Sequence, residues 1–238
     1  MKIALIGYGK MGRAIEEIAL QKGHEIVLKI SIDNIEELTT ENLQQADVAI
    51  EFTGPESAVN NLSACFDAGL PVVCGSTGWL NNWDEMIALC HQKNSGLLYA
   101  SNFSIGVNIF FELNTYLAKM MNNYNSYDAQ LTEVHHTEKK DAPSGTAITL
   151  ANQIIEQFTH KKRWVNTPTE NDEELQIISQ RIDPAPGIHK VLYTSPIDDI
   201  EIIHTAHNRK GFAAGAVLAA EFMAGKKGVY SMKDVLGF

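Results

Sequence analysis

The sequence predicts an α/β protein in which a doubly wound parallel sheet is joined to a smaller α+β domain with an open mixed sheet. Two observations carry this prediction. In the first part of the chain, short apolar segments alternate with segments of helical period, which is typical of parallel strands joined by crossover helices. In the later part, several strand-like segments follow one another without intervening helices, which is typical of an antiparallel or mixed sheet.

The first strand is predicted at Lys2–Ile6, followed by an amphipathic helix that ends near Gly23 and a second strand at Glu25–Ile30. A G-x-G-x-x-G motif fills the turn between the first strand and the helix. Two of its glycines permit a tight turn and the close approach of a pyrophosphate, and the third lets helix and strand pack. This context predicts a Rossmann-type dinucleotide site made by Gly7, Tyr8, Gly9, Lys10, Met11 and Gly12.

The residue expected to meet the ribose of the dinucleotide is Asp33, which follows the last glycine by about 20 residues. A carboxylate at this position repels the 2′-phosphate of NADP, and acceptance of that phosphate usually relies on a nearby arginine. The next residue is Asn34, and no Arg or Lys follows in the loop. We therefore predict NADH as the preferred cofactor. Lys10 and Lys29 could supply positive charge, which keeps NADPH as an alternative.

The α/β alternation then continues. Further strands and helices are expected at Asp47–Phe52, Pro55–Ala68, Pro71–Cys74, Trp83–His91 and Leu97–Ala100. In doubly wound sheets, ligands bind beyond the carboxyl ends of the strands. Small polar residues follow several of these ends, although turn formation explains them equally well at any single position.

The pattern changes after Asn102, and a second domain is predicted. Its expected elements are a helix at Val107–Met121, a strand at Tyr127–His136, a helix beginning at Ser144, a polar loop at Thr159–Glu174, and strands at Leu175–Ile182, Lys190–Thr194 and Ile200–Thr205. A last helix, Phe212–Ala224, carries small residues that permit packing back on the first domain. We expect a dinucleotide-binding domain of residues 1–105 completed by 208–238, and a substrate-binding and oligomerisation domain of residues 106–207. Arg209, near the crossing, is expected to serve the hinge rather than the substrate.

Composition limits the classes of partner. The chain has 238 residues, and its formal net charge of −10 at pH 7 argues against nucleic acid or an anionic membrane surface as a partner. No apolar segment approaches the roughly 18 residues that indicate a membrane span, and the first apolar run is too short for a signal peptide. Cys65, Cys74 and Cys90 lack metal-binding spacing, so we expect reduced thiols, no metal centre and a cytoplasmic location.

The most informative stretch is Leu131–Thr149. It places His135 and His136 at the end of a predicted strand and Lys139 shortly after them. Ser144 is a plausible N-cap, so the amides that follow it would lie at a helix N-terminus, where free N–H groups and the helix dipole attract anions. Each residue alone is more often a surface feature, but together they predict a site for an anionic substrate with proton donors in reach.

This stretch, from Glu133 to Ala147, fills every fixed position of the pattern H-H-x-x-K-x-D-A-P-S-G-T-A. It resembles the signature of the 4-hydroxy-tetrahydrodipicolinate (dihydrodipicolinate) reductases of bacterial diaminopimelate and lysine synthesis. Two further segments, 75–78 and 100–108, resemble that family's G-T-T-G and A-x-N-F-S-x-G-V-N motifs. The glycine turn departs from the family pattern: it is one residue shorter and has Lys10 in place of the usual arginine.

The resemblance implies NAD(P)H-dependent reduction of a cyclic imine dicarboxylate, with hydride transfer from the nicotinamide and loss of water. It implies that His135 donates or accepts a proton, that Lys139 acts as a proton donor or only as a fixed positive charge, and that His136, Gly145 and Thr146 hold the substrate carboxylates. The family's homotetramers form through the open sheet. Residues expected to border the nicotinamide and its ribose are Gly75, Ser76, Thr77, Ala100, Ser101, Asn102 and Phe103.

Two other functions account for part of the sequence. An amino-acid or sugar dehydrogenase would explain the segment from Gly7 to Asp33 but not the filled signature. A non-catalytic NAD sensor would need the glycine motif but not His135 or Lys139. The complete signature favours the reductase.

Overall fold

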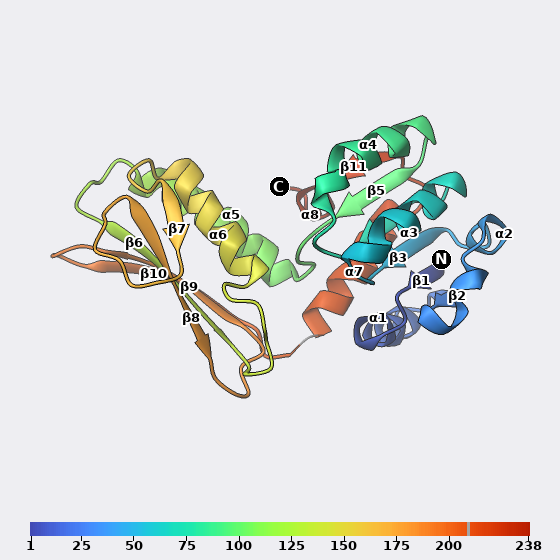
Figure 1. The fold of residues 1–238 in the computed structure, drawn as a ribbon, viewed down its shortest axis with the longest axis horizontal. Coiled ribbons are helices and arrows are strands. Elements are labelled where there is room, and N and C mark those ends of the chain that lie inside the picture. The colour runs from blue at the N-terminus through green and yellow to red at the C-terminus, as the bar shows by residue number, and fades with distance from the viewer. Residues whose placement is uncertain (209) are drawn as a thin grey trace. The chain divides into compact units, whose positions relative to one another are not determined.

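The computed structural model describes residues 1–208 and 210–238, so the expected hinge role of Arg209 lies outside the described residues. The chain divides into two compact units (Figure 1). Unit 1 comprises Met1–Ile105 and Lys210–Phe238, and unit 2 comprises Gly106–Arg209. Among the helices of the described residues, none is both long and apolar enough to cross a membrane.

Unit 1 contains a parallel sheet of six strands in the order β11-β5-β4-β3-β1-β2. The predicted doubly wound sheet is thus confirmed. The chain runs from β1 outward to β2 and then to β3 on the other side of β1, so the direction of winding reverses between β1 and β3, where such sheets bind ligands. The strands are β1 (Lys2–Ile6), β2 (Glu25–Ile30), β3 (Val48–Glu51), β4 (Val72–Cys74), β5 (Gly96–Tyr99) and β11 (Gly228–Tyr230).

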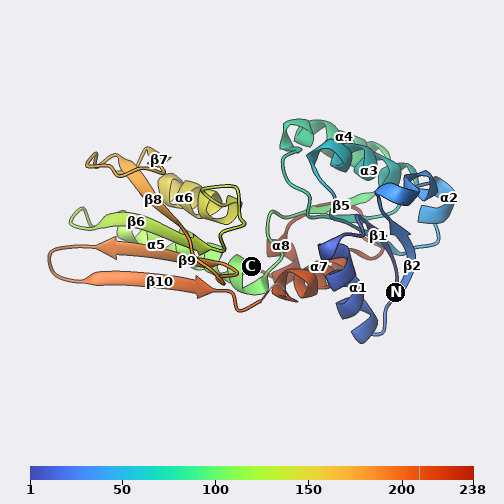
Figure 2. The ribbon, with the colours of Figure 1, turned by 60° about the horizontal axis from the view of Figure 1, so that its bottom comes forward.

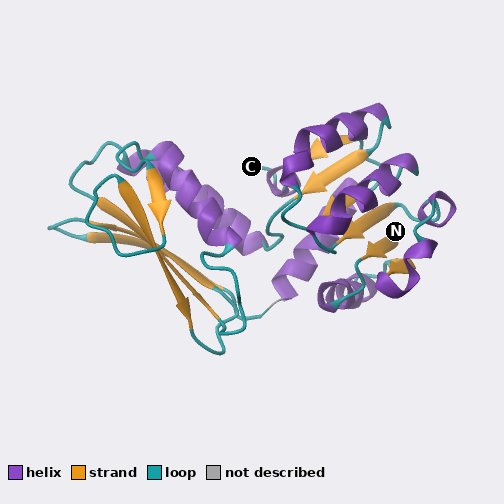
Figure 3. Ribbon diagram, viewed as in Figure 1, coloured by secondary structure: helices purple, strands orange, loops and turns teal. Residues whose placement is uncertain are grey.

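Helices cover both faces of this sheet (Figure 3). Alternate residues of β1 point to opposite faces, so Ile3 and Leu5 join one apolar core and Ala4 and Ile6 join the other. Strands buried on both faces explain the nearly continuous apolar runs in the sequence. The helices of unit 1 are α1 (Lys10–Gln21), α2 (Thr40–Leu43), α3 (Pro55–Asp67), α4 (Trp83–Gln92), α7 (Lys210–Met223) and α8 (Met232–Leu236), with the 3-10 turns η1 (Ile32–Glu37) and η2 (Leu80–Asn82).

The small residues of α7 allow close packing within unit 1, as predicted. A Cβ at Gly215 would lie 1.7 Å from the carbonyl oxygen of Phe103, so no larger residue fits there. The sequence did not predict β11 and α8. β11 is only three residues long and is recognisable by its pairing with β5, a tertiary contact that local periodicity does not reveal.

Unit 2 contains a five-stranded mixed sheet in the order β10-β9-β6-β8-β7. β6 runs parallel to β8 and antiparallel to β9, and β9 pairs with β10 as the hairpin seen in Figure 2. One face packs against the helices α5 (Ile105–Met121) and α6 (Gly145–Gln157) around a single apolar core. The strands are β6 (Asp128–His135), β7 (Arg163–Val165), β8 (Glu174–Arg181), β9 (Ile188–Thr194) and β10 (Asp199–Thr205).

The prediction of a loop at Thr159–Glu174 was wrong in part, because this segment contains β7 and the first residue of β8. β7 is three residues long and pairs with β8 alone, at the edge of the sheet. An ion pair between Arg163 and Glu174, with 2.5 Å between Nη2 and Oε1, joins the two strands. Three residues are too few to show an alternating pattern, and the sequence around β7 is polar, so the segment is typical of a loop.

Candidate active site

The glycine motif after β1 forms a tight turn with an open helix start. Gly7 has a φ of +97°, and a Cβ there would lie 2.1 Å from the carbonyl oxygen of Phe52. A Cβ at Gly12 would lie 2.5 Å from the carbonyl oxygen of Gly7, which brings α1 close to the turn. Gly9, the N-cap of α1, differs: within the described chain, no atom outside its immediate surroundings lies within 4 Å of a Cβ built there. The turn therefore leaves space at a helix N-terminus, which fits a pyrophosphate.

Side chains beside this turn form a charged cluster. The Glu16 carboxylate accepts a hydrogen bond from the Tyr8 hydroxyl and pairs with the Lys29 ammonium, whose Nζ lies 2.5 Å from Oε1. Hydrogen bonds from Lys29 and then from Tyr8 lower the pKa of Glu16. Lys29 is thus already neutralised by a carboxylate. Lys10 begins α1 and is exposed, and Met11 follows it.

Asp33 lies in η1 directly after β2, and its side chain is exposed. Ser31 and Asn34 fix this loop: the Ser31 hydroxyl accepts a hydrogen bond from the amide of Asp33 at 3.2 Å, and the Asn34 side-chain oxygen accepts one from the amide of Ser31 at 2.7 Å. The carboxylate of Asp33 is therefore presented at the end of β2 by an ordered turn, where the sequence places the ribose contact.

The ends of β3 and β4 border a hollow of about 230 Å³. A Cβ at Gly75 would lie 2.3 Å from ring atoms of Phe52, so the loop after β4 can pass this ring only with glycine at that position. The hollow brings together residues of two predicted cofactor segments, 7–12 and 75–77, and of the loop after β3. It is lined by Met11, Phe52, Thr53, Gly54, Pro55, Gly75, Ser76 and Thr77.

Glu51, a fully buried carboxylate that was not predicted as a site residue, contacts two residues that line the hollow. Its Oε1 accepts hydrogen bonds from the Ser76 hydroxyl at 3.0 Å and from the Thr53 amide at 3.1 Å. Ser76 in turn accepts a hydrogen bond from the Thr53 amide at 2.8 Å. The hydroxyl of Ser76 therefore connects the loops after β3 and β4. Because this hydroxyl is already engaged, the groups of the loop that remain for a ligand are the backbone of Ser76 and the neighbouring residues. An acidic residue ending the apolar strand VAIE was the available signal.

The segment after β5 is largely structural in unit 1. Ala100 packs against the apolar core, and Phe103 is buried with its ring centroid 5.5 Å from that of Phe52. Asn102 is buried, and its side-chain oxygen accepts a hydrogen bond from the amide of Ser104 at 2.8 Å. Ser101 is exposed. Asn102 and Phe103 thus fix the shape of the loop next to the carboxyl end of β5.

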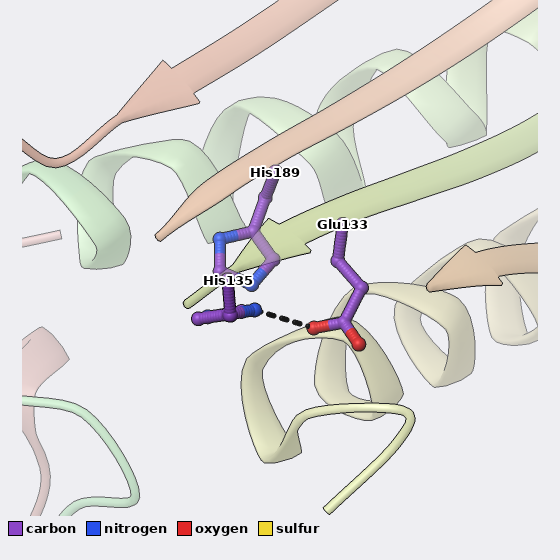
Figure 4. A group of neighbouring side chains, drawn as sticks. All are labelled: Glu133, His135 and His189. Carbon is purple, nitrogen blue, oxygen red and sulfur yellow. Dashed lines mark ion pairs between the residues drawn. The ribbon is translucent and has the colours of Figure 1, made fainter. Parts of the chain in front are cut away.

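In unit 2, the carboxyl end of β6 places Glu133 and His135 on the face that packs against the helices. Residues i and i+2 of a strand point to the same side, so both side chains extend the buried row of Ala129 and Leu131. Figure 4 shows the two groups facing each other, with 2.9 Å between Nδ1 of His135 and Oε2 of Glu133. The two atoms form a close ion-pair contact rather than a hydrogen bond.

Glu133 is fully buried and has two further partners on its other oxygen. Its Oε1 accepts a hydrogen bond from Nη2 of Arg181 at 3.0 Å and from the backbone amide of Ser144 at 3.2 Å. Burial opposes ionisation, but the contacts from His135, Ser144 and Arg181 outweigh it and hold the pKa of Glu133 well below its usual range. Glu133 is therefore a charged group at the centre of the site.

His189 is the third member of this cluster and pairs with Glu133 across the β6–β9 ladder. Its ring centroid lies 5.1 Å from that of His135 in an edge-to-face arrangement, and its Nε2 lies 3.2 Å from the Ser144 hydroxyl. Burial, followed by the nearby His135, lowers the pKa of His189 to about 3. His189 is therefore neutral near pH 7.

The signature loop after β6 is held by ionic contacts. Lys139 donates to both carboxylate oxygens of Asp141, at 2.8 and 2.7 Å, and Arg181 donates to the backbone carbonyl of Asp141 at 2.5 Å. Thr137 donates hydrogen bonds to Asp183 from its amide and its hydroxyl. His136 is half-buried, unlike the buried His135. The two adjacent histidines thus occupy different environments.

Ser144 caps α6, as predicted, and its hydroxyl accepts a hydrogen bond from the Ala147 amide at 3.2 Å. Gly145 is the first residue of α6, and a Cβ built on it would meet no described atom within 4 Å beyond its own neighbours. Thr146 is half-buried beside it. The start of α6 is therefore open, as the start of α1 is in unit 1.

Glu133, Arg181 and His189 were not among the predicted site residues. Donor atoms of Glu133, His135 and His189 lie within 4.8 Å of one another, a spacing that could also suit a metal ion. However, Glu133 already balances the Arg181 guanidinium, and His189 is engaged with Ser144. The three side chains therefore form one connected polar cluster with Arg181 and Ser144.

Unit 2 also contains a hollow, of about 160 Å³, at the start of β6, the end of the strand far from His135. It contains Lys161, which is buried, lies 2.5 Å from a carboxylate oxygen of Asp128 and donates to the Glu174 carbonyl at 3.0 Å. The charge of Lys161 is balanced locally, and no predicted site residue lines this hollow.

Comparison with known proteins assigns both parts of the chain to one family. Residues 1–103 match the family described as dihydrodipicolinate reductase, N-terminus, and residues 106–236 match dihydrodipicolinate reductase, C-terminus. The chain is 48% identical over 236 residues to the 4-hydroxy-tetrahydrodipicolinate reductase of Christiangramia forsetii, covering 99% of this chain and 98% of the relative. It is 32% identical over 269 residues to that of Neisseria meningitidis serogroup B, covering 100% of this chain and 97% of the relative.

Among solved structures, the fold is similar to that of a dipicolinate-bound dihydrodipicolinate reductase from Paenisporosarcina sp. TG-14. The TM-score is 0.76 at 22% sequence identity, with 97% of each chain covered. An amine dehydrogenase from Mycobacterium smegmatis shares the fold more distantly, with a TM-score of 0.60 at 12% identity, covering 97% of this chain and 94% of that one.

Proposed function

The chain belongs to the dihydrodipicolinate reductase family, and on that premise we propose which residues carry its reaction and which nicotinamide it prefers. It is an oxidoreductase of diaminopimelate and lysine biosynthesis that reduces 4-hydroxy-tetrahydrodipicolinate to tetrahydrodipicolinate with a nicotinamide cofactor and loss of water. The observation that carries the site assignment is the filled signature, which places His135 beside a buried carboxylate and close in sequence to an open helix start.

Unit 1 is the dinucleotide-binding domain in this proposal. The turn Gly7–Gly12 would hold the pyrophosphate, since Gly9 leaves open space at the start of α1. The loops at Gly75–Thr77 and Ala100–Phe103 would border the nicotinamide, which supplies the hydride when bound. Glu51 would keep the first of these loops in place through Ser76 and Thr53.

NADH is the preferred cofactor in this proposal. Asp33 presents an exposed carboxylate at the end of β2, which favours ribose hydroxyls over a 2′-phosphate. Lys29 is paired with Glu16 and is therefore a poor partner for an added phosphate. Lys10 remains exposed at the start of α1, so NADPH would be used less well rather than refused.

Unit 2 is the substrate-binding domain. The amides of Gly145 and Thr146 at the open start of α6, together with His136, would bind the two carboxylates of the substrate. Dipicolinate, to which the Paenisporosarcina enzyme is described as bound, is a dicarboxylate of the same kind. Lys139 would add positive charge, but it must first exchange its contacts with Asp141 for contacts with the substrate.

His135 is the group we assign to proton transfer. Its Nδ1 faces the Glu133 carboxylate, which leaves Nε2 as the nitrogen that can reach a ligand. An imidazole exchanges protons readily near neutral pH, whereas Lys139 serves as a fixed charge where negative charge builds up.

The oligomer and location are also part of the proposal. The sheet face of unit 2 opposite the helices carries partly exposed residues such as Lys190, Leu192 and Ile203, and we propose that this face joins four copies into a homotetramer. All three cysteines are buried thiols that form no disulfide within the described residues, which fits a reducing cytoplasm.

The test is NADH oxidation followed by absorbance, with substrate generated in place from pyruvate and aspartate semialdehyde by the preceding synthase. Oxidation that depends on the synthase, and is faster with NADH than with NADPH, supports the proposal. His135→Gln should lose roughly 10²–10⁴-fold in kcat, the share that a positioned general acid supplies. The matched control is His160→Gln on the surface of the same unit. Equal rates for His135→Gln and wild type would remove His135 from the mechanism.

A further inference from the structure

We propose that Glu133 and His189 are positioning residues that hold the proton donor His135 and the substrate-binding start of α6 in one rigid group, with Ser144 as the link between them. This inference rests on the proposed role of His135. Neither Glu133 nor His189 would touch the substrate. Each would act through the groups it contacts.

Glu133 connects the two parts of the site because its carboxylate oxygens have different partners. Oε2 faces Nδ1 of His135 at 2.9 Å, and Oε1 accepts the backbone N–H of Ser144 at 3.2 Å. A movement of His135 away from its position would therefore be resisted by the same carboxylate that fixes the N-cap of α6. Contacts of this kind commonly tighten into hydrogen bonds when substrate binds.

The contact with Glu133 also selects which nitrogen of His135 faces outward. A carboxylate beside Nδ1 favours a proton on that nitrogen. The opposite side of the ring is kept clear by Gly187, since a Cβ at Gly187 would lie 3.2 Å from Nε2 of His135. Nε2 is thus the nitrogen that can pass a proton to a ligand.

His189 supports the same arrangement from the neighbouring strand. Its Nε2 lies 3.2 Å from the Ser144 hydroxyl, which also accepts the N–H of Ala147. Its ring packs edge-on against His135. Burial keeps His189 uncharged, so it restrains His135 without repelling the positive charge that His135 carries as a proton donor.

Several charged or titratable groups surround His135, and a change in its pH dependence must be interpreted with all of them in view. They are Glu133 on β6, Arg181 on β8, His189 on β9, and Lys139 and Asp141 in the signature loop. Of these, only Glu133 directly contacts Nδ1 of His135 in the described chain.

The experiment compares Glu133→Gln with wild type in the synthase-coupled assay across pH, with NADH binding measured separately by fluorescence. Glutamine keeps the shape of the side chain but cannot balance the charge of a protonated His135. We expect kcat to fall roughly 10- to 100-fold, a part of the contribution of a positioned general acid. We also expect the high-pH limb of the rate profile to move to lower pH, while NADH affinity stays within a factor of about two. A merely structural role would leave the position of that limb unchanged.

The matched control is Glu174→Gln, which removes a carboxylate paired with an arginine in the same sheet without touching His135. It should leave the pH profile unchanged. If Glu133→Gln fails to fold by circular dichroism, Glu133→Asp replaces it: the charge remains but is withdrawn from Nδ1, so kcat falls while the limb stays nearer its wild-type position. His189→Leu should raise KM for the substrate roughly 10-fold. His189→Gln, whose side chain can still reach Ser144, should show a smaller rise in KM.

The outcomes separate this inference from the proposed function. A Glu133 variant with wild-type kcat and pH profile, alongside an inactive His135→Gln, overturns the inference and leaves the function intact. Normal activity in His135→Gln itself would instead contradict the proposed role of His135. In Glu133→Gln, a loss of kcat without movement of the high-pH limb would show that Glu133 supports only the fold.

Discussion

Ser144→Ala should destabilise unit 2 more than the loss of a helix cap alone explains. The serine hydroxyl accepts the N–H of Ala147 and also contacts Nε2 of the buried His189. Loss of an N-cap costs about 1 kcal/mol. Leaving a buried polar nitrogen without its partner costs about 1–3 kcal/mol more. The free energy of unfolding should therefore fall by roughly 2–4 kcal/mol, and the Tm by roughly 5–15 °C.

The matched control is Thr39→Ala. The Thr39 hydroxyl caps α2 by accepting the N–H of Asn42 at 3.2 Å, but it contacts no buried histidine. Its removal should cost only about 1 kcal/mol. Calorimetry can distinguish the two variants, since Ser144 and Thr39 lie in separate compact units that can give separate unfolding transitions. Equal losses for Ser144→Ala and Thr39→Ala would refute the coupling between Ser144 and His189. Ser144→Ala should also raise KM for the substrate, because the start of α6 loses its fixed position.

Two further predictions follow from the same structure. Gly9→Ala should weaken NADH binding at least about 10-fold with little change in Tm, because its Cβ would enter only the space left for a pyrophosphate, whereas Gly7→Ala should prevent folding, because its Cβ would lie 2.1 Å from the carbonyl oxygen of Phe52. Fluorescence titration measures NADH affinity and calorimetry measures Tm. Unchanged NADH affinity in Gly9→Ala would contradict a pyrophosphate site at this turn. The free energy of unfolding should fall as pH drops from about 6.5 towards 3, because the unfolded chain protonates His189 at its ordinary pKa, whereas the folded chain protonates it only near its lowered pKa. The contribution of His189 to stability is therefore complete above pH 6.5. His189→Gln should flatten this part of the curve of unfolding free energy against pH, and an acid dependence identical to that of wild type would contradict the prediction.

Local signals were enough to predict most of the fold. The apolar runs of β1 and β2, the glycine turn between them and the Ser144 cap each depend on residues close together in the chain. The signature loop was predictable for the same reason. β7 and β11 were missed because each is three residues long and is defined by pairing with a distant strand.

Arg181 and His189 could not be predicted as supporting groups from the sequence, because strand register brings them to Glu133. Glu133 meets His189 only through the antiparallel pairing of β6 and β9, and Arg181 reaches Glu133 from the parallel strand β8. Glu133 lies two residues before His135, on the same face of β6, which was a usable local signal. His189 lay in a plain alternating strand, where a buried histidine is indistinguishable from a core residue without the register.

The measurement that tests the central claim most directly is the transfer of deuterium from [4,4-²H₂]NADH to tetrahydrodipicolinate, followed by mass spectrometry. The proposed reductase places one deuterium in each product molecule, and His135→Gln should form labelled product far more slowly while still binding NADH. Unlabelled product, or labelled product formed equally fast without His135, would contradict the assignment of the reaction to this site.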